Sequence, residues 1–296
     1  NVPGAAVVVV RGDEPLLLKG FGVREIGKPE KVTPDTVFPL ASCSKAFTSA
    51  LIAMLVDDEA LGWDDRVAKH LPGFALSDPN ANALLTVRDL LSHRTGIGGH
   101  DLLWYRAPWG IDETLRRAKA LPPDYHKLDA AGKPVAVPWY EIAEPNPAGS
   151  VNATARDLAA WLKFHLSDGL DPNGTRIVSV KNLDETKTPH TPVRLDGIAK
   201  ALNPDTAQLS YCMGWLCYDH RGKKVLSHGG MIDGFRVQVT LLPGENLGVA
   251  VLANLQETRM NAAVTNSLLD LYCGLEARDW NAFFRKVVDQ EAADRR

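Results

Sequence analysis

A serine and a lysine three positions apart are the residues in this chain whose types and spacing could do chemistry. Ser42 and Lys45 lie within the segment Phe38–Thr48, which reads FPLASCSKAFT. A serine hydroxyl needs a base before it acts as a nucleophile, because its own pKa is far too high. A lysine supplies that base only when its pKa is lowered, and burial and the positive end of a helix both lower it. The pair predicts nucleophilic catalysis by Ser42 with Lys45 as its base.

The element that must position this pair is a helix that begins near the serine. A proline-containing loop leads into a helical pattern whose apolar residues share one face: Phe47, Leu51, Met54 and Leu55. Ser42 would then occupy the first turn, with Lys45 one turn later on the same side. The backbone N–H of Ser42 would point at a developing oxyanion. The alternative is a capping serine and a solvated lysine, since roughly one Ser-x-x-Lys match is expected by chance in such a chain.

Strand patterns flank this helix at both ends of the chain. Ala5–Val10 and Leu16–Lys19 are apolar runs joined by a hairpin signal at Arg11–Glu14. The last third predicts further strands and a closing helix, in the order Leu209–Tyr218, Lys224–Ser227, Arg236–Leu241, Leu247–Leu252 and Met260–Tyr272. In Arg236–Leu241 apolar and polar residues alternate, which is typical of a half-buried antiparallel strand.

The middle of the chain favours helices. Thr86 and Asp89 resemble a capping box before a helix that stops at Gly96, and another helical pattern covers Ala155–Leu166. These elements predict an α+β fold, an α/β sandwich in which one antiparallel sheet is built from both chain ends and flanked by helices. We expect a single domain over 1–296, with a sheet lobe at about 1–40 and 205–296. A helical lobe would occupy about 41–204.

Composition and charge narrow the classes of partner. The chain has 296 residues, is 45% hydrophobic and carries a net charge of −3, which does not favour nucleic-acid binding. No apolar run approaches the ~20 residues of a membrane span. We therefore expect a small-molecule or peptide substrate, and the sequence leaves the oligomeric state open. A removed leader and a trimmed chain would look the same at Asn1.

Cysteine and histidine spacing predicts neither a metal site nor a cofactor. The four cysteines form no Cys-x-x-Cys pair, and no His-x-x-x-His pair falls on a predicted helix. Cys212 and Cys217 are five positions apart, an odd separation that puts them on opposite faces of a strand. A disulfide between them is not expected.

Four segments, in order and spanning well over half of the chain, resemble one known family. Phe38–Phe74, Leu85–Ile97 (LTVRDLLSHRTGI), Pro147–Leu162 (PAGSVNATARDLAAWL) and Val225–Asn254 are similar to class C β-lactamases, D,D-peptidases and their esterase relatives. The resemblance implies a β-lactamase/transpeptidase-like fold and an acyl-enzyme formed on Ser42. It also favours a periplasmic or secreted location over a cytoplasmic one. His93 and Arg94, within SHRTG, are interpreted as structural residues near a helix C-terminus.

The resemblance assigns a third motif to His228-Gly229-Gly230, where other members carry Lys-Thr-Gly or His-x-Gly. At a strand end it would face Ser42 across the cleft. Met231 would supply a second oxyanion N–H, and His228 would hold a polar or anionic part of the substrate or steady the hydrogen-bond network. The alternative is a strand-end histidine before a Gly-Gly turn.

The family's second motif, Tyr-x-Asn or Ser-x-Asn on the helical lobe, has no clear counterpart. No Tyr-x-Asn occurs in the chain, and Ser150-Val151-Asn152 lies past the expected place, where we interpret it as a helix cap. The interval from Arg94 to Pro147 is several tens of residues too short, with the break near Pro122-Pro123-Asp124. The helical lobe is therefore expected to be abbreviated, either by deletion or because part of the natural sequence is not present.

Three functions remain in competition. The first is a serine hydrolase acting on an ester, amide or β-lactam carbonyl, with His-Gly-Gly favouring an esterase or peptidase over an efficient β-lactamase. The second is a weakly active or inactive penicillin-binding or sensor protein on the same scaffold, because the Tyr-x-Asn motif is missing. A metal-dependent hydrolase is a distant third, since the histidines are dispersed.

Overall fold

An eight-stranded antiparallel sheet carries the fold, and the computed structural model describes it within residues 2–74, 76, 79–96 and 146–294. Its strands are β1 (Gly4–Arg11), β2 (Glu14–Gly22), β5 (Thr191–Val193), β6 (Leu209–Tyr211), β7 (Leu216–His220), β8 (Lys223–Ile232), β9 (Phe235–Leu242) and β10 (Leu247–Ala253). They lie in the order β2-β1-β10-β9-β8-β7-β6-β5. A separate two-stranded ladder joins β3 (Phe38–Pro39) to β4 (Asn152–Ala153).

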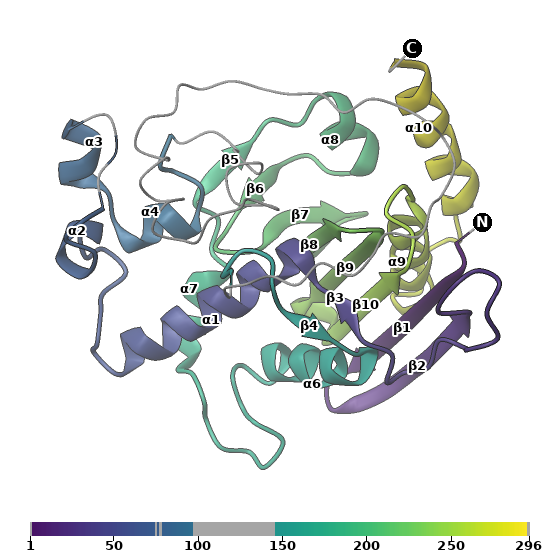
Figure 1. Ribbon diagram of the computed structural model, residues 1–296, viewed down its shortest axis with the longest axis horizontal. Coiled ribbons are helices and arrows are strands. Elements are labelled where there is room, and N and C mark those ends of the chain that lie inside the picture. Colours follow the sequence, from purple (N-terminus) through teal and green to yellow (C-terminus); the bar gives the residue numbers. More distant parts are fainter. Residues whose placement is uncertain (1, 75, 77–78, 97–145, 295–296) are drawn as a thin grey trace.

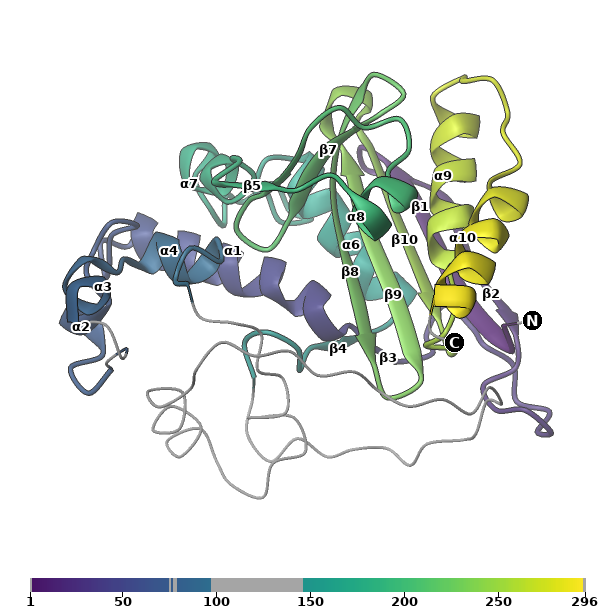
Figure 2. The ribbon, with the colours of Figure 1, turned by 90° about the horizontal axis from the view of Figure 1, so that it is seen from above.

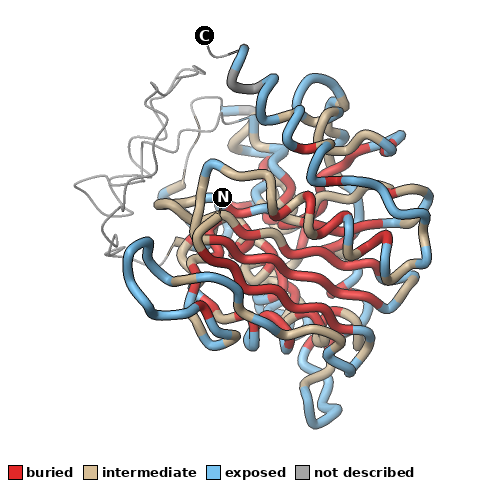
Figure 3. Tube along the Cα trace, turned by 90° about the vertical axis from the view of Figure 1, so that its right-hand side faces the viewer, coloured by how far each residue is buried: buried red, intermediate tan, exposed pale blue. Residues whose placement is uncertain are grey.

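Strand β1 lies one strand in from the β2 edge of the sheet, and its run of valines is buried. Figure 3 shows the buried residues concentrated along the sheet strands. Val8 and Val10 belong to the apolar cluster on one face, and Val7 and Val9 to the cluster on the other. Side chains alternate across a strand, so a continuous apolar run requires layers on both sides. The partner of β1 comes from the far end of the chain, with Val8 opposite Ala250 of β10.

Helices cover both faces of the sheet (Figures 1 and 2). The described helices are α1 (Ser44–Asp57), α2 (Val67–His70), α3 (Pro79–Leu84), α4 (Val87–Leu91), α6 (Ala155–Leu166), α7 (Val180–Thr186), α8 (Gly197–Leu202), α9 (Met260–Tyr272) and α10 (Trp280–Asp294). Of these, α2, α3 and α4 lie around the far end of α1, away from the sheet. Helix α6 packs on β1 and β10 from one side, while α9 packs on β9 and β10 from the other and carries α10 outside it.

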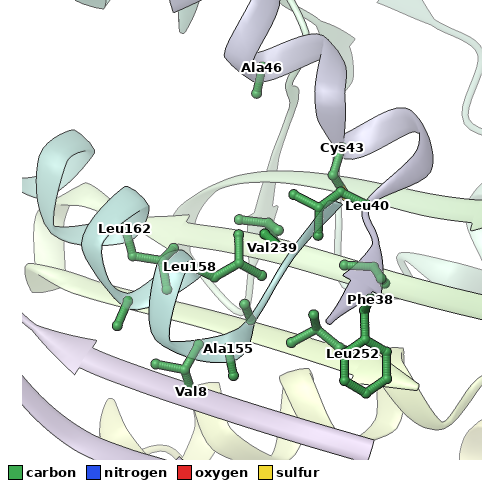
Figure 4. Close-up of a cluster of buried hydrophobic side chains, with 14 of the residues drawn as sticks. Val8, Phe38, Leu40, Cys43, Ala46, Ala155, Leu158, Leu162, Val239 and Leu252 are labelled. Carbon is green, nitrogen blue, oxygen red and sulfur yellow. The ribbon is translucent and has the colours of Figure 1, made fainter. Parts of the chain in front are cut away.

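Helix α1 turns its small residues to the core and its large ones outward. Ala46, Ala50 and Ala53 are buried, whereas Leu51 is 60% and Leu55 is 40% exposed. Figure 4 shows Cys43 and Ala46 at the start of this helix, with Cys43 close to Leu40. Small inward residues let the helix backbone approach the sheet closely, which places its first turn beside β8.

The predicted α+β architecture is confirmed: one antiparallel sheet from both chain ends, flanked by helices. Three details of the expectation were wrong. Leu209–Tyr218 is two strands, β6 and β7, because a turn at Cys212–Trp215 interrupts it. The helix Met260–Tyr272 does not close the fold, since α10 follows. His228-Gly229-Gly230 lies inside β8 rather than at its end.

The helix cap expected at Ser150–Asn152 belongs instead to Thr154. Thr154 and Asp157 form a capping box at the start of α6, while the Ser150 hydroxyl donates to the Asn146 carbonyl oxygen and accepts from its N–H. The second predicted box, Thr86 with Asp89, is confirmed. The break near Pro122-Pro123-Asp124 lies outside the described residues, and the division into two lobes stays a prediction.

Candidate active site

Ser42 and Lys45 are brought together by a helical start. A short 3-10 helix, Ala41–Cys43, runs directly into α1, so the two side chains are one turn apart. Lys45 Nζ lies 3.0 Å from Ser42 Oγ. Ala41, just before the serine, has a left-handed backbone with a φ of 46°. Such a conformation costs free energy in an alanine and persists only where packing on both sides enforces it.

The segment before α6 holds the lysine from the other side. Lys45 Nζ donates to the Ala148 carbonyl oxygen at 3.1 Å, and Thr48 Oγ1 donates to the Pro147 carbonyl oxygen at 2.5 Å. The buried Ser44 hydroxyl accepts the N–H of Val151 at 3.1 Å. These bonds link α1 to a segment about a hundred residues away, and they orient the amine towards the serine. The sequence had signalled this segment only as part of a family helix.

Strand β8 forms the opposite wall. The Cys43 thiol donates to the His228 carbonyl oxygen at 3.2 Å, which joins the residue after Ser42 to the third motif. A Cβ placed on Gly230 would lie 2.1 Å from the Leu40 carbonyl oxygen, so only glycine permits this approach. Gly229, by contrast, is exposed, and the side chain of Met231 is also largely exposed. It is therefore mainly the backbone of β8, and less its side chains, that lies against the segment Leu40–Cys43 around the serine.

His228 is held as a neutral imidazole. Its Nδ1 lies 2.7 Å from the Gly229 carbonyl oxygen, which can only accept, so Nδ1 carries the proton. Its Nε2 lies 3.2 Å from the Tyr211 hydroxyl, which then donates. Burial, and less strongly the charge of Lys45, lower the pKa of His228 to about 4, even though the Gly229 bond opposes the shift. At neutral pH this histidine carries no charge.

Two residues beside His228 were not found by sequence reasoning. Tyr211 is buried, and burial raises the pKa of its hydroxyl, so it remains a proton donor at neutral pH. The ring of His93 lies against it with centroids 4.6 Å apart, and burial together with the charge of Lys45 lowers the His93 pKa. His93 had been interpreted as structural. The sequence feature that could have drawn attention to Tyr211 is Gly214, in the turn that ends the strand at Tyr211.

Arg94, the other SHRTG residue, forms an ion pair with Asp89 at 3.4 Å. The interval in which the Tyr-x-Asn motif should occur, Arg94 to Pro147, lies almost wholly outside the described residues. A hollow of about 420 Å³ opens beside the loop that joins β2 to β3, where Phe38, Phe235 and Asn254 also line it. Ser42, Lys45 and His228 do not line it, so its position does not mark the reacting atoms.

Among the described residues, no group of three or more histidine, cysteine or acidic side chains could hold a metal ion. Nor does any helix in that part of the chain have the length and apolar character to cross a membrane.

Comparison with known proteins gives one family. The sequence matches the Beta-lactamase family over residues 1–130 and 126–273. The Unguisins hydrolase ungD of Aspergillus violaceofuscus is 25% identical over 98% of this chain and 65% of its own length. Penicillin-binding protein 4 of Amycolatopsis lactamdurans is 27% identical over 86% of this chain and 81% of its own. The chain thus spans just under two thirds of the first relative.

Solved structures show the same fold at low identity. The octameric penicillin-binding protein homologue from Pyrococcus abyssi superposes with a TM-score of 0.72 at 19% identity, over 93% of this chain and 74% of that one. A class C beta lactamase from Rhodobacter sphaeroides gives 0.68 at 19% identity, over 91% and 95%.

The comparisons also bear on chain length. The alignment with the Aspergillus protein is 371 residues long, although this chain has 296, so that relative holds residues with no counterpart here. The two family matches meet at residues 126–130, close to the break predicted near Pro122-Pro123-Asp124.

Proposed function

This chain belongs to the beta-lactamase family, and from that premise we propose that it is a serine hydrolase that works through an acyl-enzyme on Ser42. The family and its hydrolase relatives support a hydrolase-type function. The single observation that carries the serine chemistry is the 3.0 Å separation of Lys45 Nζ and Ser42 Oγ. Nucleophile and base within hydrogen-bond reach, with the base oriented by a third group, is the arrangement that activated serines require. Here the Ala148 carbonyl oxygen is that third group.

The reaction follows from this geometry. Lys45 takes the Ser42 proton through the unprotonated form of its amine as Oγ attacks the carbonyl carbon, and the carbonyl oxygen gains the negative charge. The backbone N–H groups of Ser42 and Met231 stabilise that oxyanion, the second from β8 across the cleft. Collapse of this tetrahedral intermediate expels the leaving group, which takes a proton from Lys45. Water then attacks the ester on Ser42 and releases the acid.

The substrate class follows from the neutral state of His228. A lysine at this position offers a fixed positive charge to a substrate carboxylate, whereas His228 has one nitrogen bonded to Gly229 and the other to Tyr211. A neutral imidazole gives no charge-assisted hydrogen bond, which is about twice as strong as a neutral one. We therefore favour esters or amides without a carboxylate at this point, and place efficient β-lactam hydrolysis second.

A slow penicillin-binding protein is the second candidate. It is favoured by the absence of Tyr-x-Asn from the sequence, because this family expects a tyrosine there to pass a proton to the leaving group. Such a protein would form the acyl-enzyme and release it slowly. Steady turnover of a p-nitrophenyl ester supports the hydrolase, whereas a single stoichiometric burst supports the binding protein.

Covalent labelling tests the proposal. Intact mass after treatment with a fluorophosphonate should show one adduct, absent in Ser42→Ala. Lys45→Arg should label no faster than Lys45→Ala, because arginine stays protonated and cannot act as a base. Ser44→Ala is the matched control: it removes the buried hydroxyl that accepts the Val151 N–H, so labelling can slow, but the adduct on Ser42 should still form. Equal labelling of Ser42→Ala and the unaltered chain would remove Ser42 as the nucleophile.

A further inference from the structure

A pair of cysteines lies on the hairpin next to the candidate site. The turn between β6 and β7 brings Cys212 N–H to the Trp215 carbonyl oxygen at 2.7 Å, while Ser210 pairs with Cys217. Cys212 and Cys217 are therefore diagonal neighbours on one face of the hairpin. The sequence argument that placed them on opposite faces was wrong because it assumed one continuous strand. The side chains of Cys212 and Cys217 therefore project from the same face of the hairpin, on neighbouring strands.

The two thiols differ in exposure and in surroundings. Cys212 is fully buried, whereas Cys217 is half-buried and therefore reaches solvent. The Cys212 S–H donates to the Lys187 carbonyl oxygen at 3.3 Å. The neighbouring Cys212 thiol and the Lys224 charge lower the pKa of Cys217 to about 7, against the opposing effects of burial and of the Asp219 charge. Reactive thiolates occur in such electropositive, partly exposed places.

We propose that Cys217 and Cys212 form an oxidisable thiol pair that hydroperoxides convert to a disulfide. The Cys217 thiolate attacks the peroxide oxygen and becomes a sulfenic acid, while the peroxide leaves as an alkoxide or hydroxide ion. The Cys212 sulfur then attacks the Cys217 sulfur and expels the hydroxyl group as water. Two cysteines are oxidised, and one hydroperoxide is reduced to an alcohol or water.

Closing this bond moves the turn. Diagonal residues of an antiparallel pair have Cα atoms about 7–8 Å apart, and a disulfide closes at up to about 6.8 Å. The Met213-Gly214 turn must therefore tighten. Gly214 lies directly on α1, since a Cβ there would be 2.6 Å from the Ala46 nitrogen and the Lys45 carbonyl carbon. Tyr211, beside Cys212, donates to His228. Oxidation should thus reach the candidate active site through two contacts.

Mass spectrometry of the whole protein tests the chemistry without any assay of hydrolysis. Trypsin cleaves after Lys200 and after Arg221, and no lysine or arginine lies between them. Both cysteines are therefore in one peptide, residues 201–221. After limited hydrogen peroxide and alkylation, this peptide should lose the mass of two hydrogens and take no alkyl group. A thiol reductant should restore both alkylation sites.

Variants separate the two thiols. Cys212→Ser should stop the reaction at a sulfenic acid on Cys217 that dimedone captures, and Cys217→Ser should abolish the response. Cys273 is the matched control, since it is also half-buried but burial raises its pKa, so at pH 7 iodoacetamide should modify it at least tenfold more slowly than Cys217. Equal rates for the two cysteines, or peroxide treatment that oxidises Cys217 without engaging Cys212, would overturn the proposal.

The link to the active site rests on the proposed function and has a separate readout. Fluorophosphonate labelling of Ser42 should slow in the disulfide form and recover after reduction. If the disulfide forms and labelling never occurs in either form, the hydrolase proposal fails while the thiol proposal stands. If labelling occurs and no disulfide forms, the reverse holds.

Discussion

Two adjacent glycines in β8 should respond in opposite ways to the addition of one methyl group. A Cβ on Gly230 would lie 2.1 Å from the Leu40 carbonyl oxygen, whereas a Cβ on Gly229 meets nothing nearer than the Val237 carbonyl oxygen at 3.8 Å. Neither glycine has a positive φ, so backbone strain does not separate them. Gly230→Ala must therefore push the strand and the serine loop apart, while Gly229→Ala fits.

The size of the effect follows from the overlap. Real Cβ atoms essentially never approach a neighbour closer than 3.0 Å, so the Leu40–Ala41 backbone must retreat by about 1 Å. Overpacking of this kind costs about 1–3 kcal/mol of stability. Because Ser42 follows that segment directly, the nucleophile is displaced as well. A misplacement of about 1 Å lowers a rate by roughly a hundredfold.

Two measurements on purified variants check this reasoning. Fluorophosphonate labelling gives the rate of Ser42 modification, and thermal unfolding gives the melting temperature. Gly230→Ala should lose most of the labelling rate and several degrees of melting temperature, whereas Gly229→Ala should unfold at the temperature of the unaltered chain. Equal behaviour of the two variants, or a fully labelled Gly230→Ala, would show that Leu40 and β8 are not packed as described.

Three further predictions concern single contacts. Tyr211→Phe removes the donor to His228 Nε2. The loss of one hydrogen bond, about 1 kcal/mol, should slow labelling about fivefold, and the pH dependence of labelling above pH 6 should stay unchanged. The pKa of Asp270 is lowered, because hydrogen bonds from buried partners such as Trp280 outweigh burial. Its stabilisation is therefore present above pH ~4 and lost as pH falls below it, so urea unfolding of Asp270→Asn should depend less on acid. Thr154→Ala removes the α6 cap and should cost about 1 kcal/mol by urea unfolding.

Much of the fold could be predicted from local pattern. The valine run of β1, the alternation in Arg236–Leu241 and the capping box at Thr86 are local signals, and each gives the element seen. The error in strand assignment arose where a short turn reverses the chain direction. The turn at Met213-Gly214 is buried and short, so its flanking strands looked continuous.

The candidate site divides in the same way. The spacing of Ser42 and Lys45 on a helix is set by local geometry, so the sequence was sufficient to predict their contact. Tyr211, His93 and the Ala148 carbonyl oxygen reach the site from distant segments, and a backbone carbonyl has no side-chain signature. The lowered pKa of His228 depends on burial and on the charge of Lys45, and neither can be read from its neighbours in the sequence.

Because β1 pairs with β10, the sheet cannot be completed until β10 has been synthesised. The ribosome releases the valine-rich β1 long before β10, and until then only β2 can pair with one of its edges. The other edge waits for residues 247–253, and Val8 meets Ala250 only after the intervening chain has emerged. Such long-range closure is slow, and an uncovered apolar strand edge invites pairing with other chains. Nascent chains of this protein should therefore depend on holding chaperones until β10 is made, and truncation before it should yield aggregates.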